Sequence, residues 1–477
     1  MRLRKALLFK VFRFWTRPRI PAKNRSRPHL SDTRSPRRLK SRFTSLRCCD
    51  RGATTSGLLS NSELNKMQRP EGVDTFEYSS DDFSFSTNTW APGSPFELSK
   101  FDLELRKRWD KAMKGGAFRY DIDHITTRII PGPKHYVAQL NLLRAKERRK
   151  PQDIRSITQP FNPKQFNFTW VGPHEIIFYM RHKETASSPK KSVLNNIIEM
   201  ENDTGDGSCN GSSPAACDQT QQKALDGESN GETGNQRLET ASEERHALVI
   251  NVSPMEYGHT LLVPQIDQCL PQVLTETSIR VALEMTLLSK HRGLRMGFNS
   301  LCAFASVNHL HLHAYYLEHE LVVEYCPVEH LTGSVYEITT IPVPGFGFQL
   351  HGSTVQEVSR QVHKVSSYFQ EADIAHNLFI CRGTVFDEKR GSENTTVRVF
   401  IWPRRKFVGT KSAEEFNVAS IELGGHLPIR EEDGYHSLTE ESVDAIIADS
   451  QLPPEHYQQI KKHITDMFTP TPSKSQS

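Results

Sequence analysis

The sequence predicts an α+β fold with antiparallel sheets and packed helices, and two observations carry this prediction. Short runs rich in β-branched and aromatic residues alternate along the chain with longer segments that have a helical apolar stripe. Residues 306–316 (Ser-Val-Asn-His-Leu-His-Leu-His-Ala-Tyr-Tyr) place a histidine at every second position, which is the period of a β-strand. A length of 477 residues allows one large or two medium domains.

Residues 1–66 are a basic extension that we expect to be disordered. The first fifty residues hold sixteen Lys and Arg against two acids, and Ser and Pro are frequent among them. A mitochondrial transit peptide and a nucleic-acid-binding arm are alternatives to the interpretation we prefer, an extension without functional consequence. Without these fifty residues the chain has 44 basic and 54 acidic residues, so we expect no nucleic-acid partner.

Hydropathy and cysteine usage are those of a reduced, water-exposed protein. No run of about 18 apolar residues exists, so no membrane-spanning helix and no membrane partner are expected. The eight cysteines form no Cys-x-x-Cys pair and no dense framework. This usage is typical of a reducing compartment, and we expect a cytoplasmic location.

The N-terminal part of the globular region has a weak pattern. Residues 67–96 are polar and have no clear period, whereas a helix is predicted over 97–114, ending at a Gly-Gly pair. The charged run 146–150 is interpreted as a solvated turn. Strand-forming residues are concentrated in 135–140, 166–170 and 175–179.

Residues 185–244 differ from everything around them. They contain no Phe, Tyr or Trp, eleven acids and four Lys or Arg, with many small polar residues. Such a segment cannot bury enough apolar surface to offset its ordering entropy. We therefore predict a disordered insert between two core strands.

The middle of the chain predicts two apolar strands, a helix and the histidine strand. The two strands lie within 246–264 and are joined by a turn at Pro254 to Gly258. Residues 271–291 carry a helical apolar stripe. In the C-terminal half, helices are predicted over 354–370, 439–448 and 454–468, and strands over 376–382 and 397–402.

The histidine row has three interpretations. On a strand, His309, His311 and His313 would share one face while the leucines between them fill the core. They would serve as zinc ligands, as a nucleophile held in one tautomer with supporting groups, or merely as a solvated strand face. Zinc would need further ligands, and the candidates, none of which has a motif spacing, are His259, Glu318 and His319.

Five segments carry a resemblance to a known family: 161–169 (Phe-Asn-Pro-Lys-Gln-Phe-Asn-Phe-Thr), 250–254 (Ile-Asn-Val-Ser-Pro), 297–300 (Gly-Phe-Asn-Ser), 306–313 and 376–379 (His-Asn-Leu-Phe). Their order resembles the histidine-triad superfamily, which includes the sugar-1-phosphate nucleotidylyltransferases. Within it the chain is similar to the GDP-D-glucose phosphorylases of animals and the GDP-L-galactose phosphorylases of plants. The similarity covers roughly residues 85–465, apart from the insert.

The resemblance implies two histidine-triad-like modules, of which the first carries the active histidines. The expected division is a catalytic module over 97–336, which contains the insert, and a degenerate second module over 337–470. The extension 1–66, the segment 67–96 and a tail of 471–477 lie outside these modules.

The resemblance also implies a reaction, in which inorganic phosphate cleaves a GDP-hexose to GDP and a sugar 1-phosphate. His311 is the implied nucleophile and would carry a guanylyl group, with His309 and His313 beside it. The implied substrate-binding residues are Asn299, Ser306, Asn251, His259 and Arg382, with His376 as a further candidate near the phosphates. No metal or other cofactor is implied, and a homodimer is a further expectation.

Two other functions stay open at this point. A histidine-triad hydrolase would use the same nucleophile with water as the acceptor. A non-catalytic binding protein would use the histidines to hold a structural zinc ion. The choice of guanine and of glucose rests on the resemblance alone.

Overall fold

The computed structural model describes residues 72–87, 90, 95–183, 244–408 and 416–469. The chain divides into two units, Met1–Met67 and Gln68–Ser477, and every described residue belongs to the second. The predicted extension and tail, and all of the predicted insert except Glu244, lie outside the described residues. For the described part, the α+β prediction is confirmed.

Eleven strands of the described chain form one large sheet in the order β1-β4-β5-β6-β8-β7-β12-β13-β11-β10-β9. Neighbouring strands are antiparallel except for β1 and β4. Their bounds are Thr75–Tyr78 (β1), Ile176–His182 (β4), His246–Ile250 (β5), Thr260–Val263 (β6), Leu294–Asn299 (β7), Leu312–Tyr316 (β8), Glu329–Thr332 (β9), Val335–Ile338 (β10), Gly345–Gln349 (β11), Ala375–Thr384 (β12) and Thr395–Arg404 (β13).

Two long helices cover one face of this sheet. Helix α5 (Glu276–Leu288) and helix α6 (Val355–Glu371) pack against each other and against a shared apolar core. The predicted stripe of α6 is buried as expected, and Thr275 and Thr354 cap the two N-termini by accepting backbone N–H groups. The same core takes in alternate residues of the strands, among them Leu312 of β8, because side chains of a strand alternate between faces.

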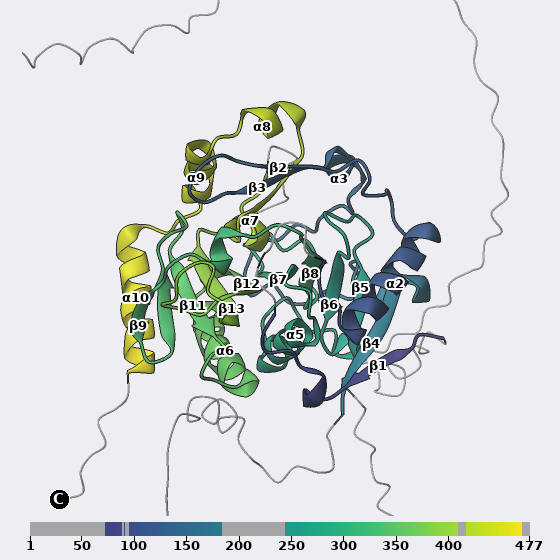
Figure 1. Cartoon of the computed structure of the whole chain (residues 1–477), viewed down its shortest axis with the longest axis horizontal. Coiled ribbons are helices and arrows are strands. Elements are labelled where there is room, and N and C mark those ends of the chain that lie inside the picture. The colour runs from purple at the N-terminus through teal and green to yellow at the C-terminus, as the bar shows by residue number, and fades with distance from the viewer. Residues whose placement is uncertain (1–71, 88–89, 91–94, 184–243, 409–415, 470–477) are drawn as a thin grey trace, which may run out of the picture. The chain divides into compact units, whose positions relative to one another are not determined.

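The opposite face carries a second core beneath a small sheet with the order β14-β3-β2. Figure 1 shows this small sheet with α8 and α9 beside it. The elements on this face are β2 (Thr126–Ile129), β3 (Val137–Leu140), β14 (His426–Ile429), α3 (Leu142–Glu147), α7 (Ser420–Leu423), α8 (Glu432–Ser437) and α9 (Glu440–Ala448).

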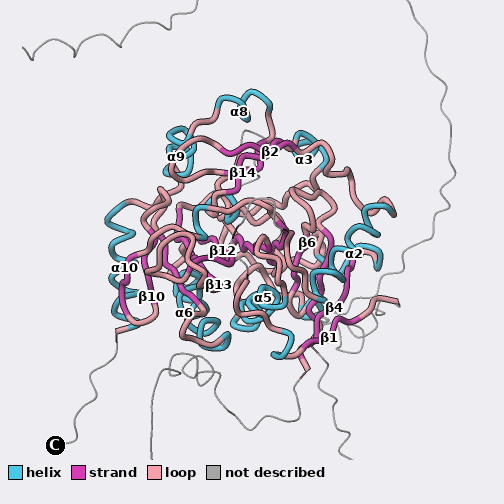
Figure 2. The backbone as a smooth tube through the Cα atoms, viewed as in Figure 1, coloured by secondary structure: helices cyan, strands magenta, loops and turns pink. Residues whose placement is uncertain are grey.

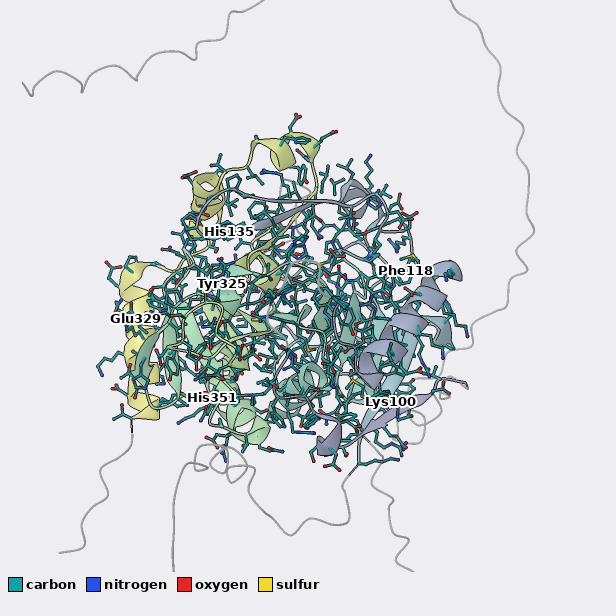
Figure 3. All side chains as sticks on the ribbon, viewed as in Figure 1. Lys100, Phe118, His135, Tyr325, Glu329 and His351 are labelled. Atoms are coloured by element: carbon teal, nitrogen blue, oxygen red, sulfur yellow. The ribbon has the colours of Figure 1, made fainter. Side chains whose placement is uncertain are left out.

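The edges of the large sheet are flanked by the remaining two long helices. Helix α2 (Lys100–Lys114) packs against β4, and α10 (Pro454–Phe468) against β9. Figure 2 shows helices around the margins of the strands, and in Figure 3 side chains fill the space between the ribbons. The predicted helix at 97–114 therefore exists but begins at residue 100, because Ser99 and Asp102 form a capping box there.

Several elements differ from the sequence prediction. The predicted strand at 166–170 is wrong, since Phe168–Trp170 is a short 3-10 helix that pairs with no strand. The segment 67–96, which has no clear period, supplies the edge strand β1. Strands β9 to β11 had no predicted counterpart.

Candidate active site

A pocket opens on the face of the large sheet that α5 and α6 leave uncovered. Its floor includes Val249 of β5, Leu261 of β6 and His313 of β8, and His311 lies beside them. Its walls come from distant parts of the chain, the segments around residues 144–175 and 417–430. The pocket is therefore a property of the tertiary fold, and only its histidines are marked by a local pattern.

The histidine row is only partly a strand, which corrects the prediction. Strand β8 begins at Leu312, so His313 lies in it while His309 and His311 precede it. The alternation persists nevertheless, because Leu310 and Leu312 are both fully buried in the core under the helices. The row is thus an extended segment of which only the end joins the sheet.

A side chain takes the place of a strand partner before β8. The Gln272 carboxamide oxygen accepts the backbone N–H of His311 at 2.9 Å, and its nitrogen donates to the carbonyl of His311 at 3.1 Å. The same nitrogen donates to the carbonyl of Asn299 at 2.9 Å. Gln272 is itself buried, so these bonds hold the backbone of His311 in a site sheltered from water.

The tautomer of His311 is fixed by the backbone of His309. Its Nδ1 lies 2.7 Å from the carbonyl oxygen of His309, and a carbonyl only accepts, so Nδ1 must carry the proton. In the neutral ring Nε2 then holds the lone pair. His311 lines the pocket, and its neutral form has the tautomer that a nucleophile at Nε2 requires.

His309 is oriented differently and does not line the pocket. Its Nδ1 accepts the backbone N–H of Phe168 at 3.0 Å, so Nε2 carries the proton. The phenyl ring of Phe168 packs against His309 and His311, with ring centroids 5.5 and 5.0 Å away. Burial first, and the neighbouring His311 second, lower the pKa of His309 to about 4. His309 is therefore neutral and structural in its contacts.

His313 is coupled to His259 in the turn before β6. The backbone N–H of Met255 donates to Nδ1 of His259, so Nε2 of His259 is protonated and donates to Nδ1 of His313, 3.0 Å away. This leaves the proton of His313 on Nε2. Burial, and secondly the charge of His313, hold the pKa of His259 well below its usual value. The four histidines thus form two hydrogen-bonded pairs, His309 with His311 and His259 with His313.

The other predicted substrate contacts divide into two groups. Asn251, Asn299 and Ser306 line the pocket. The amide oxygen of Asn299, however, already accepts hydrogen bonds from the Asn377 side chain and the Ser420 backbone, at 2.7 and 2.9 Å. Asn299 therefore joins β7 to β12 and α7 at the rim of the pocket.

Arg382 and His376 lie away from the pocket, which corrects their predicted role. Both share the helix-covered face of β12 with Leu378 and Ile380. The guanidinium of Arg382 is buried and donates to four backbone carbonyls, those of Ser84, Phe85, Thr286 and Ser289. Its two terminal nitrogens thus donate within the protein, away from the histidine row.

The main residues missed by the sequence analysis are arginines. Arg144, Arg148 and Arg149 line the pocket with His311, and Arg430 reaches it from the end of β14. The interpretation of 146–150 as a solvated turn is therefore wrong for two of its members, since Arg148 and Arg149 are half-buried. Burial lowers the pKa of both, and the charge of Arg144 lowers that of Arg148 further.

One end of the pocket is apolar and aromatic. Phe166, Phe168 and Val171 line it together with Leu261. The Arg149 guanidinium stacks 3.5 Å from the centre of the Phe166 ring, and lies 3.9 Å from the Glu175 carboxylate. A flat apolar wall with charged groups at its edge suits a heteroaromatic ring.

Two further tests concern the described residues only. Within them, no three His, Cys, Asp or Glu side chains are grouped so as to hold a metal ion. In the same part of the chain, no helix is both long enough and apolar enough to cross a bilayer.

Fold and site together define a class: an imidazole of fixed tautomer beside a cluster of guanidinium groups, which is chemistry suited to transfer at phosphorus. Comparison with known proteins agrees with this class. Family models described as "GDPGP1-like, N-terminal domain" and "GDPGP1-like, C-terminal domain" match residues 100–202 with 220–315, and 317–470. The chain belongs to this GDPGP1-like family.

Individual relatives point the same way. The chain is 39% identical over 408 residues to GDP-D-glucose phosphorylase 1 of Xenopus laevis, covering 84% of this chain and 97% of the relative. It is 37% identical to the Homo sapiens protein of the same name, over 83% of this chain and 92% of the relative. GDP-L-galactose phosphorylase 2 of Arabidopsis thaliana is 27% identical, over 75% and 74%.

Among solved structures, yeast Ap4A phosphorylase Apa2 is similar, with a TM-score of 0.43 and 12% identity, over 76% of this chain and 97% of that one. This likeness is too weak to support a conclusion.

Proposed function

We propose that the protein is a GDP-D-glucose phosphorylase, which cleaves GDP-glucose with inorganic phosphate to give GDP and glucose 1-phosphate. The observation that carries the proposal is the hydrogen bond from Nδ1 of His311, a pocket residue, to the carbonyl of His309, which places the lone pair of the neutral ring on Nε2, the atom that would attack phosphorus. The names of the relatives supply the choice of GDP and glucose.

The proposed reaction has two displacements at the α-phosphorus. Nε2 of His311 forms a bond to this phosphorus while the bond to the bridging oxygen breaks, and glucose 1-phosphate leaves with the electron pair. An oxygen of inorganic phosphate then attacks the same phosphorus, the bond to Nε2 breaks, and GDP leaves. A neutral imidazole avoids repulsion between nucleophile and phosphate anion, and the protonated Nε2 of His313 donates to a phosphoryl oxygen as charge develops.

We also propose the finer fold, two histidine-triad-like modules of which the second is degenerate. The strand order supports it. In the first half, the consecutive strands β4, β5 and β6 are followed by α5 and then by β7 and β8, with β8 inserted beside β6. The second half repeats this with β9, β10 and β11, then α6, then β12 and β13, with β13 beside β11. Strand β13, which corresponds to β8, contains no histidine.

The repeat favours a module boundary ahead of β9 at Glu329, earlier than the expected residue 336. The proposed partners are a GDP-hexose and inorganic phosphate, without nucleic acid or membrane. A cytoplasmic location is proposed on the free thiols of Cys269, Cys302, Cys326 and Cys381. The homodimer stays a prediction.

The test is incubation of the protein with GDP-glucose labelled in the α-phosphate, with and without inorganic phosphate. We expect labelled GDP only with phosphate, and an acid-labile label on the protein when phosphate is withheld. His311→Ala should retain neither turnover nor label, and a normal thermal melt of that variant is the control for folding. Accumulation of GMP at equal rates with and without phosphate would favour the hydrolase instead.

A further inference from the structure

One wall of the pocket is built by both halves of the chain. Arg148 follows α3 in the first half, whereas Arg430 follows β14 in the second, and both line the pocket with His311. Strand β14 pairs with β3, which leads into α3, so the small sheet joins the two segments. With the Asn417 amide oxygen turned toward Arg430, it lies 3.0 and 2.6 Å from the two terminal guanidinium nitrogens.

Arg144 lies in the same group and is anchored, since its guanidinium donates to the carbonyl of Ser253. The three guanidinium groups, Arg144, Arg148 and Arg430, are close enough to act on one another. Burial first, and the positive charge of Arg148 second, lower the pKa of Arg430 to about 10 against the opposing carboxylate of Glu422. Three buried or half-buried cations against one carboxylate form a site of net positive charge, which a bound anion would stabilise.

The geometry of displacement at phosphorus indicates which anion would bind at these arginines. Attacking and leaving groups lie roughly in line on opposite sides of the phosphorus. The phosphate of the departing glucose 1-phosphate and the entering inorganic phosphate must both lie opposite Nε2 of His311, so both occupy the same space.

We propose that Arg148 and Arg430, with Arg144 beside them, form a single phosphoryl subsite, which holds the β-phosphate of the GDP-sugar in the first displacement and inorganic phosphate in the second. This inference rests on the proposed function. It gives the second half of the chain a direct part in catalysis, because Arg430 touches the acceptor and competes with water for the guanylyl group.

The test separates the two displacements. Protein loaded with α-labelled GDP-glucose in the absence of phosphate is chased with increasing phosphate, and release of labelled GDP is followed. In Arg430→Met the phosphate concentration for half-maximal release should rise at least about tenfold, since a charge-assisted contact is lost. The share of label released as GMP should rise as well. Arg405→Met, an exposed arginine of the same half, is the matched control and should behave as wild type.

Two further measurements exclude a merely structural effect. Inhibition by GMP, which has no second phosphate, should change by less than about threefold in Arg430→Met if the remainder of the pocket is intact. Arg430→Lys keeps the charge but not the planar fork, and should give an intermediate phosphate dependence. If Arg430→Met does not fold, Arg148→Met in the same chase decides the matter.

The outcomes are distinct. A wild-type protein that traps no label refutes the proposed function. A wild-type protein that traps label and releases it with phosphate, beside Arg430 and Arg148 variants with unchanged phosphate dependence, refutes only the shared subsite.

Discussion

Replacing Gln272 by leucine should destabilise the protein and displace His311, although Gln272 itself does not line the pocket. Its side chain makes three buried hydrogen bonds, two with the backbone of His311 and one with the carbonyl of Asn299. Leucine has a similar volume, so the change removes the bonds without opening a large cavity. A buried group left without its partner costs about 1–3 kcal/mol, and three such groups suggest a loss of about 4 kcal/mol.

Urea unfolding at pH 7 measures this loss, and phosphorolysis of GDP-glucose measures its effect on catalysis. A misplaced nucleophile should lower kcat at least about 100-fold. Gln268→Leu, at an exposed position four residues earlier, is the control and should change the free energy of unfolding by no more than about 0.5 kcal/mol. If Gln272→Leu unfolds at the same urea concentration as wild type and retains kcat, then the side chain does not hold the histidine segment, and the account of why β8 begins at Leu312 fails.

Two more predictions follow from the protonation of the histidines. His259→Leu removes the donor that fixes His313, so kcat should fall about tenfold or more while the KM for GDP-glucose changes little; an unchanged kcat would mean that His313 keeps its tautomer unaided. Burial lowers the pKa of His309 from 6.5 to about 4. Between pH 6.5 and pH 4 the unfolded chain therefore binds a proton at this histidine that the folded chain does not. About 3 kcal/mol of the free energy of unfolding at pH 7 should be lost as the pH falls to 4. Urea unfolding of wild type and His309→Gln at pH 7 and 4.5 measures this, and an equal loss in both would assign the effect to other groups.

The sequence predicted the elements whose own residues show a clear helical or strand period. Helices α6 and α10 each have a stripe of apolar residues that is buried against the core, and both helices lie where they were expected. Strand β11 was missed because its sequence, Gly-Phe-Gly-Phe-Gln, is poor in strand propensity. A Cβ at Gly345 would lie 2.4 Å from the Trp402 ring, so the residue that weakens the local pattern is required by the packing. The segment 166–170 alternates like a strand, but Phe168 gives its backbone N–H to His309 instead of to a neighbouring strand.

The residues of the site also divide into those that a local pattern predicts and those that it does not. The histidines were predictable, because the alternation of histidine and leucine along one segment indicates which side chains share a face. Arg382 was misplaced for a related reason: alternation does not state which face of the sheet carries the pocket, and Arg382 shares the helix-covered face with Leu378 and Ile380. Arg148 and Arg430 were missed because no pattern local to either segment indicates that β14 will pair with β3. The positive charge around His311 is therefore assembled by long-range strand pairing. A variant that disrupts the β14–β3 register should lose the acceleration of GDP release by inorganic phosphate, while the hydrogen bonds of the histidine row stay in place.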